Sequence, residues 1–370
     1  MAKKTSSSST GIRLSRLSIE NYKRLDRLEI EFPPPLMDGD LDILVLGSKN
    51  GGGKTSVLEC CSLLMVAGAV GQMKRQRYPE SESLLDLSSL LVKAGRQKAI
   101  IAGEFEQGSK KCKVTLSITA EGFGDPAVSG DALWPKDDFA QLRLGGLEQA
   151  LSSILALSSE PLILPPLLHF NSYRKVQESN PELGMMAEEY SRNQSLRIAR
   201  RLATRGLMTP VSAFKLEILR SLMGKASLFE GLDDSESVIV LATLNSLIER
   251  YCGGRIEKLR PLPDNRVAIR IKPSNSSDSF SFDGLSSGQK EMIATLFLIW
   301  RNTDKRPGIV LIDEPELHLN AEWHADFVEQ LLRLAPRNQY ILTTHSEEIF
   351  RSVDESRRAV LVPDDLEEEA

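Results

Sequence analysis

The sequence predicts an α/β fold with a mixed sheet, antiparallel strands near the N-terminus and a helical insertion lobe. Three observations lead to this prediction. Residues 12–32 alternate between apolar and polar in two runs around a polar break, which is typical of a hairpin of half-buried strands. The apolar run LDILVL leads into a Gly-rich turn and an apolar helix, and strand and helix patterns alternate again after Leu285.

The remaining elements divide the chain into parts. We expect a strand pair at AIIAGEFEQ and KCKVTLSITAE, a buried strand at LLHF, and strands again at RVAIRIKP and DSFSF. The stretch from Gly122 to Pro166 is rich in Gly, Pro and Asp, so we expect it to be irregular. The predicted parts are a disordered tail (1–11), the two parts of one α/β domain (12–180 and 253–363), a helical lobe (181–252) and an acidic tail (364–370).

Composition excludes some classes of protein and leaves others open. A hydrophobic fraction of 41% and a net charge of −5 are those of an ordinary globular protein, without a bulk attraction to nucleic acid. The four cysteines show neither metal spacing nor a disulfide framework, which favours a reducing compartment. No uncharged apolar stretch reaches the roughly 20 residues of a membrane span, so we expect a cytoplasmic protein without a membrane partner.

A phosphate loop is predicted in the stretch VLGSKNGGGKTS. A strand, a Gly-rich turn and a helix that opens with Lys54 and Thr55 form the context of such a loop. Backbone N–H groups and the Lys54 ammonium would hold phosphate oxygens, and the Thr55 hydroxyl would ligate Mg²⁺. The pattern places its first glycine at position 48, where this chain has a serine. The glycine comes one residue earlier, at Gly47. The alternative is a flexible turn before a helix. The nucleotide-binding candidates are Asn50, Gly51, Gly52, Gly53, Lys54, Thr55 and Ser56.

An acidic strand end is the second candidate site. The apolar residues 309–312 run into Asp313 and Glu314, and carboxylates at the carboxyl edge of a parallel sheet lie where ligands bind. We expect Asp313 to hold Mg²⁺ through water and Glu314 to orient or deprotonate the attacking water. A further strand ends at His345, which would contact a γ-phosphate at the same edge. The alternative is an acidic turn followed by a helix capped by Asn320.

A second Gly- and Ser-rich turn, LSSGQK, precedes another apolar helix. Ser286 and Gln289 fit a capping box, which would do no more than start the helix. The run LSSGQ also resembles the signature of ATP-binding-cassette (ABC) ATPases, Leu-Ser-Gly-Gly-Gln, with Ser287 in place of the first glycine. The resemblance covers residues 12–106 and 265–363. It rests on four motifs in fixed order: phosphate loop, signature, acidic strand and switch histidine.

This resemblance implies an ABC-type P-loop ATPase head that uses ATP and Mg²⁺, with two ATP molecules held in the interface of a two-fold homodimer or a higher homo-oligomer. By that resemblance Glu314 and His345 are catalytic, and Thr55 and Asp313 are the metal ligands. The signature residues would reach the γ-phosphate bound by a partner subunit, and a residue of the interfacial loop would join them. The residues carried over for these roles are Ser286, Gly288, Gln289 and Asn320. Gln72 and Gln177 are candidates for the family's Q-loop.

Two groups of ABC ATPases share further features with the chain. The opening LSIENYKRLDRLEIEF resembles SMC- and RecF-type heads, and by that resemblance Lys23 approaches the nucleotide. DEPELHLNAEWH and TTHSEEIF look like the OLD family and related anti-phage ATPases. The chain has no long heptad run, which excludes a complete SMC protein. Any nuclease or toxin activity would belong to a separate effector protein.

We therefore expect an ATP hydrolase that acts on DNA or controls an effector, in anti-phage defence or DNA repair. Within RNQSLRIARRLATR, Arg197, Arg201 and Arg205 recur at the spacing of one helix face, which would contact DNA, an acidic partner or only solvent. The alternatives are a regulatory subunit that uses ATP as a conformational clamp and, less favoured, the nucleotide-binding subunit of a transporter.

Overall fold

The computed structural model forms two compact units, which are described separately. The first comprises Met1–Tyr173, Asn302–Leu317 and Ala321–Ala370, and the second Arg174–Arg301 and His318–Asn320. Residues 253–301, assigned from the sequence to the α/β domain, therefore lie in the second unit. The structure describes residues 11–35, 40–48, 51–72, 88–134, 146–155, 159–178, 180–181, 212–225, 234–263, 266–317 and 319–361.

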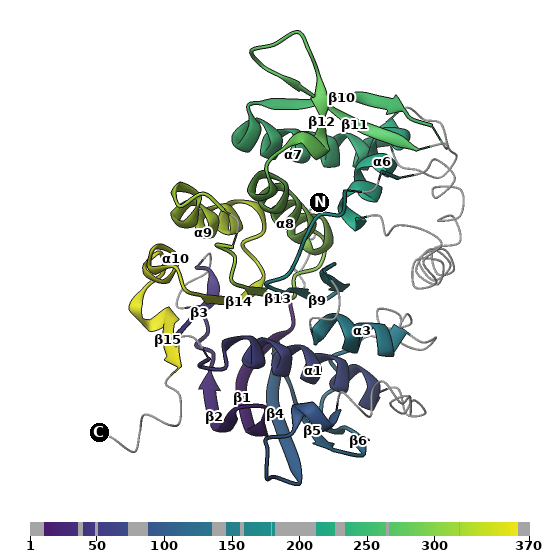
Figure 1. Cartoon of the computed structure of the whole chain (residues 1–370). Helices are drawn as coiled ribbons and strands as arrows, with labels where there is room; N and C mark the ends of the chain where they lie inside the picture. The colour runs from purple at the N-terminus through teal and green to yellow at the C-terminus, as the bar shows by residue number, and fades with distance from the viewer. Residues whose placement is uncertain are drawn as a thin grey trace, which may run out of the picture. The chain divides into compact units, whose positions relative to one another are not determined.

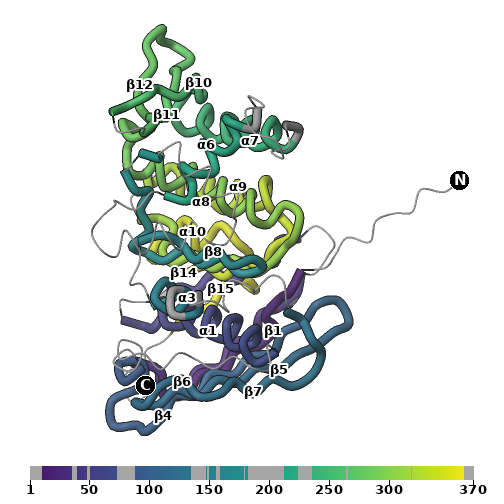
Figure 2. The backbone as a smooth tube through the Cα atoms, turned by 90° about the vertical axis from the view of Figure 1, so that its right-hand side faces the viewer, coloured from purple at the N-terminus to yellow at the C-terminus, as the bar shows by residue number. Residues whose placement is uncertain are grey.

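An antiparallel sheet begins the first unit, as the alternation of residues 12–32 predicts. Its strand order is β2-β1-β4-β5-β6, and β7 also pairs with β5 (Figures 1 and 2). Apolar side chains of β1, β4 and β5 point to one face and are buried, among them Leu17, Ile101 and Leu116. The strands are β1 (Arg13–Tyr22), β2 (Leu25–Glu31), β4 (Lys98–Gln107), β5 (Lys110–Thr119), β6 (Gly122–Phe123) and β7 (Ala127–Gly130).

A second sheet, here the central sheet, has the order β15-β3-β14-β13-β9-β8. All its neighbours pair in parallel except β8 and β9, so β3, β13 and β14 end at one edge. Helices α9 (Glu322–Leu334) and α10 (Glu347–Arg351) and the turn η3 (Glu355–Arg357) connect its later strands. The strands are β3 (Asp42–Ser48), β8 (Leu162–Leu164), β9 (Leu167–Phe170), β13 (Ile309–Asp313), β14 (Gln339–Thr344) and β15 (Arg358–Leu361). The predicted mixed α/β class is confirmed.

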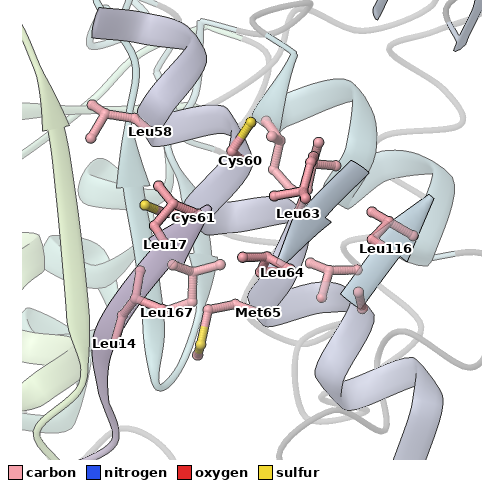
Figure 3. Packing of buried hydrophobic residues seen from close by; sticks show 14 of the residues in the cluster. Leu14, Leu17, Leu58, Cys60, Cys61, Leu63, Leu64, Met65, Leu116 and Leu167 are labelled. Atoms are coloured by element: carbon pink, nitrogen blue, oxygen red, sulfur yellow. The ribbon is translucent and has the colours of Figure 1, made fainter. Parts of the chain in front are cut away.

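Helix α1 (Lys54–Gln72) is the centre of the core of this unit. Every residue of α1 from Ser56 to Val70 is buried, because strands of both sheets pack around the helix (Figure 3). By length and composition α1 could cross a membrane, with a mean hydropathy of 1.4 over an 18-residue window, but 83% of that window is buried inside the protein. The four cysteines are free thiols, as their spacing predicts.

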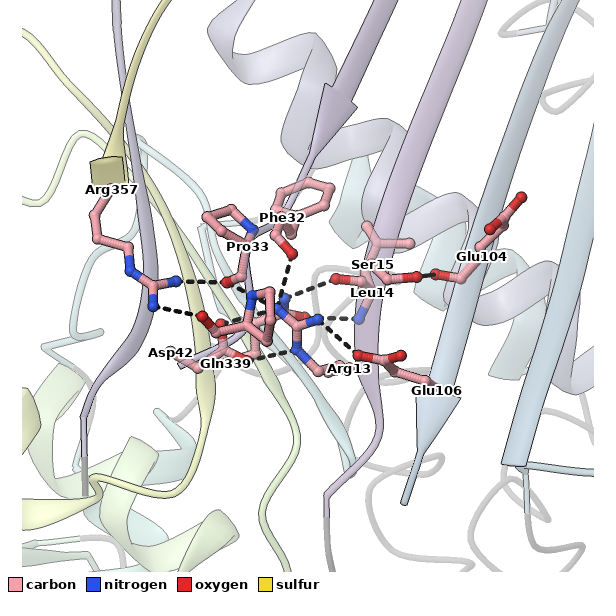
Figure 4. A network of polar contacts seen from close by, with 11 residues as sticks. Arg13, Leu14, Ser15, Phe32, Pro33, Asp42, Glu104, Glu106, Gln339 and Arg357 are labelled. Atoms are coloured by element: carbon pink, nitrogen blue, oxygen red, sulfur yellow. Dashed lines mark hydrogen bonds and ion pairs between the residues drawn. The ribbon is translucent and has the colours of Figure 1, made fainter. Parts of the chain in front are cut away.

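Polar side chains at the start of β1 join the two sheets (Figure 4). Arg13 donates to Asp42 at the start of β3 and to Glu106 of β4, both at 2.8 Å. Gln339 of β14 accepts from the backbone N–H of Leu14 at 2.7 Å and donates to its carbonyl at 2.8 Å. These contacts fix β1 relative to the central sheet.

Within the described residues, the second unit contains a three-stranded sheet of order β10-β11-β12 and the helices α6, α7 and α8. Leu219 and Met223 of α6 pack with Val267 of β11, and Asn245 of α7 accepts from the N–H of Ile256. Its elements are α6 (Ala213–Lys225), α7 (Asp234–Cys252), β10 (Gly254–Pro261), β11 (Val267–Pro273), β12 (Phe280–Ser281), the turn η2 (Phe282–Gly284) and α8 (Ser287–Thr303), which continues into the first unit.

One sequence prediction is wrong, and others lie outside the described residues. The stretch from Gly122 to Pro166 is not irregular throughout, because it contains β6, β7, β8 and helix α3 (Gly146–Ile154). Leu147, Leu151 and Ile154 recur with a helical period and are buried, so packing stabilises α3 in spite of the surrounding glycines and prolines. The predicted arginine face of the helical lobe falls outside the described residues: Arg197, Arg201 and Arg205.

Candidate nucleotide site

The Gly-rich turn lies between β3 and α1, where the sequence predicts it. Gly51 and Gly53 have φ of +84° and +80°, a left-handed conformation that L side chains rarely adopt. A Cβ on Gly53 would also lie 2.6 Å from Leu25 of β2. The first helical hydrogen bond runs from the N–H of Val57 to the carbonyl of Gly53 at 3.0 Å. The first N–H groups of a helix have no acceptor within the helix, so a helix N-terminus suits an anion.

The displaced first glycine has a packing reason. A Cβ on Gly47 would lie 2.8 Å from the ring of Phe350 on α10. Gly47 is in β3 and pairs with Thr344 of β14 and Val360 of β15, so a bulkier residue would press against α10. The departure from the usual spacing therefore fits the way α10 covers the end of β3.

Two predicted metal-binding side chains are in direct contact. Thr55 Oγ1 of α1 donates to Asp313 Oδ2 at 2.9 Å, although 258 residues separate them in sequence. The hydroxyl of Thr343, at the end of β14, donates to the other carboxylate oxygen, Asp313 Oδ1. Asp313 is fully buried, so both partners fix the orientation of its carboxylate.

The two predicted catalytic residues meet the loop lysine at the same edge. Lys54 Nζ lies 2.9 Å from His345 Nε2, and that ring nitrogen lies 3.3 Å from Glu314 Oε1. Glu314 has a φ of +46°, and its N–H donates to the carbonyl and the hydroxyl oxygen of Thr343. The N–H of His345 donates to Glu316 at 2.5 Å. Residues with a strained backbone, as Glu314 has, concentrate at functional sites.

Burial shifts the pKa of two of these groups. Burial raises the pKa of Glu314, and the neighbouring Asp313 carboxylate adds to that increase, while His345 and Lys54 oppose it. Burial also lowers the pKa of Lys54, and the Glu314 and Asp313 carboxylates oppose that decrease. A carboxylate with a raised pKa is a better proton acceptor, which suits a general base.

Lys23, in the turn between β1 and β2, forms an ion pair with the buried carboxylate of Glu59. Lys23 Nζ lies 2.7 Å from both carboxylate oxygens of Glu59 on α1, and the Tyr22 hydroxyl donates to Glu59 at 3.0 Å. Glu59 is 2% exposed, whereas the Lys23 side chain is 32% exposed. Lys23 has a φ of +49°, so this turn too is strained.

Several of these side chains line one pocket of about 410 Å³, which is large enough for a nucleotide. Asn50 lies outside the described residues. Gln72 lies at the other end of α1, about 27 Å away at 1.5 Å per residue, where it hydrogen-bonds the backbone of Asp131 and Trp134. The pocket is lined by Lys23, Arg24, Gly51, Gly52, Gly53, Lys54, Thr55, Ser56, Glu314 and His345.

The remaining candidates belong to the second unit. Ser286 and Gln289 form the capping box that the sequence allows, with backbone-to-side-chain bonds of 3.0 and 3.2 Å that open α8. The Gln289 amide also donates to the carbonyl of Tyr251. Gly288 lies in the first turn of α8 and is buried. Asn320 does not cap α9, because Ala321 occupies the N-cap position.

The donor set fits Mg²⁺. Among the described residues no cluster of three or more His, Cys, Asp or Glu side chains could hold a metal by itself. Mg²⁺ beside a nucleotide is usually held by one or two protein oxygens together with phosphates and water. The Thr55 hydroxyl and the Asp313 carboxylate supply such oxygens, 2.9 Å apart.

Comparison with known proteins finds similarity over part of the chain. A family described as "AAA domain, putative AbiEii toxin, Type IV TA system" matches residues 191–351, a range that contains the LSSGQK turn, the acidic strand and His345. This part of the chain is therefore similar to ATPase-type domains. The predicted phosphate loop lies before the matched range.

Two curated relatives are similar to part of the chain. The chain is 35% identical over 100 residues to the Septu protein PtuA of Bacillus mycoides, which is 25% of this chain and 14% of that protein. It is 30% identical over 99 residues to the retron Ec83 probable ATPase of Escherichia coli, which is 24% of this chain and 18% of that protein. The match thus spans less than a fifth of either relative. An SMC head bound to a ScpA winged-helix domain aligns with a TM-score of 0.48 and 14% identity over 92% of each chain.

Sequence reasoning missed three polar residues of the site. Thr343 orients Asp313, Glu316 binds the backbone of His345, and Glu59 holds Lys23, but the sequence patterns assign none of the three a role. Thr343 and Glu316 lie within three residues of predicted site residues, and this proximity was the available signal. Glu59 is an isolated acid in an otherwise apolar helix, and an acid in such a position needs a partner.

Proposed function

We propose that the protein is an ABC-type ATPase that hydrolyses ATP with Mg²⁺ at sites completed by a second copy, and that its ATP-bound state controls a separate effector protein in anti-phage defence. The observation that carries the proposal is the contact of Lys54, His345 and Glu314 at the edge where Thr55 meets Asp313. A phosphate-binding cation, a proton acceptor and metal-ligating oxygens thereby converge on one pocket.

The residues divide the chemistry among them. The loop N–H groups and the Lys54 ammonium bind the phosphates, and the Glu314 carboxylate orients the attacking water and accepts its proton. His345 lies between Lys54 and Glu314 and contacts the γ-phosphate. When Mg²⁺ is bound through Thr55 and Asp313, it neutralises charge that develops on the phosphate oxygens.

The second copy would supply the LSSGQK turn. In the capping box the Ser286 hydroxyl oxygen accepts a bond from the Gln289 N–H, which leaves its hydrogen to donate. Ser286 is exposed, so this hydrogen is accessible to a phosphate oxygen of a partner subunit. Helix capping and nucleotide contact in trans are therefore compatible. Gly288 and Asn320 belong to the same proposed interface.

The biological setting is proposed from similarity. DEPELHLNAEWH and TTHSEEIF resemble OLD and anti-phage ATPases, and the chain is similar to a Septu protein and a retron ATPase. A role in defence, a cytoplasmic location and an effector partner, nuclease or toxin, follow from that similarity. The arginine face at Arg197, Arg201 and Arg205 remains a proposed contact for DNA or an acidic partner.

Phosphate release from ATP tests the proposal. The wild type should hydrolyse ATP in the presence of Mg²⁺, Lys54→Ala should lose nucleotide binding, and Glu314→Gln should bind ATP but turn it over at least about 100-fold more slowly. Glu329→Gln removes an exposed carboxylate of α9 and should behave as wild type. Hydrolysis by Glu314→Gln at the wild-type rate would contradict the assignment of the base.

A further inference from the structure

The sheet of the second unit carries a row of cations on one face. In β10 and β11, Arg255 pairs directly opposite Lys272, and Lys258 directly opposite Arg270. Arg260 follows two residues after Lys258 and pairs with Ala268. Because directly paired residues of antiparallel strands point to the same side, these five cations share one face, here the cationic face: Arg255, Lys258, Arg260, Arg270 and Lys272.

The opposite face of the hairpin is the packed one. Ile256, Ile269 and Ile271 are buried, and Leu259 and Val267 pack with α6. Figure 1 shows α6 and α7 beside the hairpin. The register bulge after Ile256 keeps Arg255 and Lys258 on the same side, although three positions separate them. The cationic face is therefore fixed by the fold of this unit.

Little within the described residues neutralises the cationic face. Glu257, at the bulge, lies 4.0 Å from Lys258, whose side chain is 67% exposed. The Arg270 guanidinium donates to the hydroxyl and the carbonyl of Ser279, which holds it in place without cancelling its charge. Like charges directly opposite in a sheet are destabilising. The sheet contains two such pairs, Arg255 with Lys272 and Lys258 with Arg270. A bound polyanion would therefore stabilise it.

The chemistry of the face favours one kind of polyanion. Protein interfaces have an apolar core and are depleted in lysine, but the paired face positions of β10 and β11 hold the five cations and Ala268, with Glu257 beside Lys258 at the bulge. Interfaces with nucleic acids are polar and positively charged. The cations repeat about every 6.6 Å along a strand and about 5 Å across strands, so several can contact phosphates of one backbone at once.

We infer that the cationic face of β10 and β11 binds the sugar-phosphate backbone of a nucleic acid. It has no aromatic side chain on which bases could stack, so the contact is to phosphates and independent of sequence. The net charge of −5 confines the attraction to this face instead of the whole chain. This site differs from the proposed arginine face of residues 197–205 and from the nucleotide pocket.

The test compares two triple variants of the full chain in fluorescence anisotropy with a labelled DNA duplex and a labelled single strand, over a range of salt concentrations. The triple variant Arg255→Gln, Lys258→Gln and Arg260→Gln removes three exposed cations of the face. The control, Lys110→Gln, Lys111→Gln and Lys113→Gln, makes the same change of charge on exposed positions of β5. Both should hydrolyse ATP as the wild type does, which shows that they fold.

Wild type and control should bind both probes. For the triple variant of Arg255, Lys258 and Arg260, the slope of log K against log salt should be smaller in magnitude by about three. The conservative triple Arg255→Lys, Lys258→Arg and Arg260→Lys should keep the slope. An equal loss in the control would overturn the inference, as would binding of poly-glutamate or anionic vesicles in place of both nucleic acids. ATP hydrolysis is scored separately, so failure here leaves the proposed function standing.

Discussion

Replacing Gln339 tests the connection between the two sheets that positions the nucleotide pocket. The Gln339 side chain is 3% exposed and binds both backbone groups of Leu14, at 2.7 and 2.8 Å (Figure 4). Pairing of β1 with β2 extends only to Arg16, opposite Glu31, so Leu14 lies beyond that ladder. Gln339→Met keeps the length of the side chain and removes both bonds.

The expected effect is large for a single substitution. Each buried backbone group left without a partner costs about 1–3 kcal/mol, so the two together should lower the free energy of unfolding by about 2–6 kcal/mol. For a domain of this size that corresponds to a fall in Tm of roughly 5–15 °C. Gln330→Met is the matched control, since Gln330 is 2% exposed but donates only to the side chain of Asp326, one helical turn away.

Thermal unfolding followed by circular dichroism at one pH and one protein concentration measures the difference. Gln330→Met should lower Tm by no more than about a third as much as Gln339→Met, because it leaves no buried backbone group unsatisfied. Equal Tm values for the two variants would refute the argument that Gln339 satisfies the backbone of β1.

Two further predictions concern the pocket. Gly53→Ala should abolish ATP binding in a titration, because a Cβ would lie 2.6 Å from Leu25, whereas Gly95→Ala, with a similar φ of +78° and open space, should bind normally; normal binding by both would contradict this. Burial raises the pKa of Glu59 above its ordinary 4.5, so the folded state binds more protons and stability should fall as pH rises above 4.5. Glu59→Gln should remove that part of the pH dependence of Tm, and an unchanged profile would show that Glu59 does not contribute it.

The sequence predicts the site residues whose chemical type coincides with a local strand or turn pattern. An apolar strand, a glycine turn and Lys54 identify the phosphate loop, and an apolar strand ending in Asp313 and Glu314 identifies the acidic edge. Parallel pairing then brings these strand ends together, which is why the contact of Lys54 with His345 could be anticipated as a shared edge. The distance between Lys54 and His345 could not be predicted, because it depends on the packing of the whole sheet.

Other features have no local signal. Glu59 reads as one acid in an apolar helix, and its partner Lys23 comes from a strained turn 36 residues earlier. Helix α3 was missed because glycines and prolines around it mask its period, and only its packing shows it. The place of Gly47, one residue before the usual position, depends on the ring of Phe350, which is distant in sequence.

The central claim is that LSSGQK of one copy completes the nucleotide site of another. The most direct test is the solution mass of Glu314→Gln by light scattering, with and without MgATP, with bound nucleotide measured in the same sample. We predict a monomer without nucleotide and a dimer with it. A mass that stays monomeric while ATP is bound would contradict the claim, and LSSGQK would then do no more than start α8.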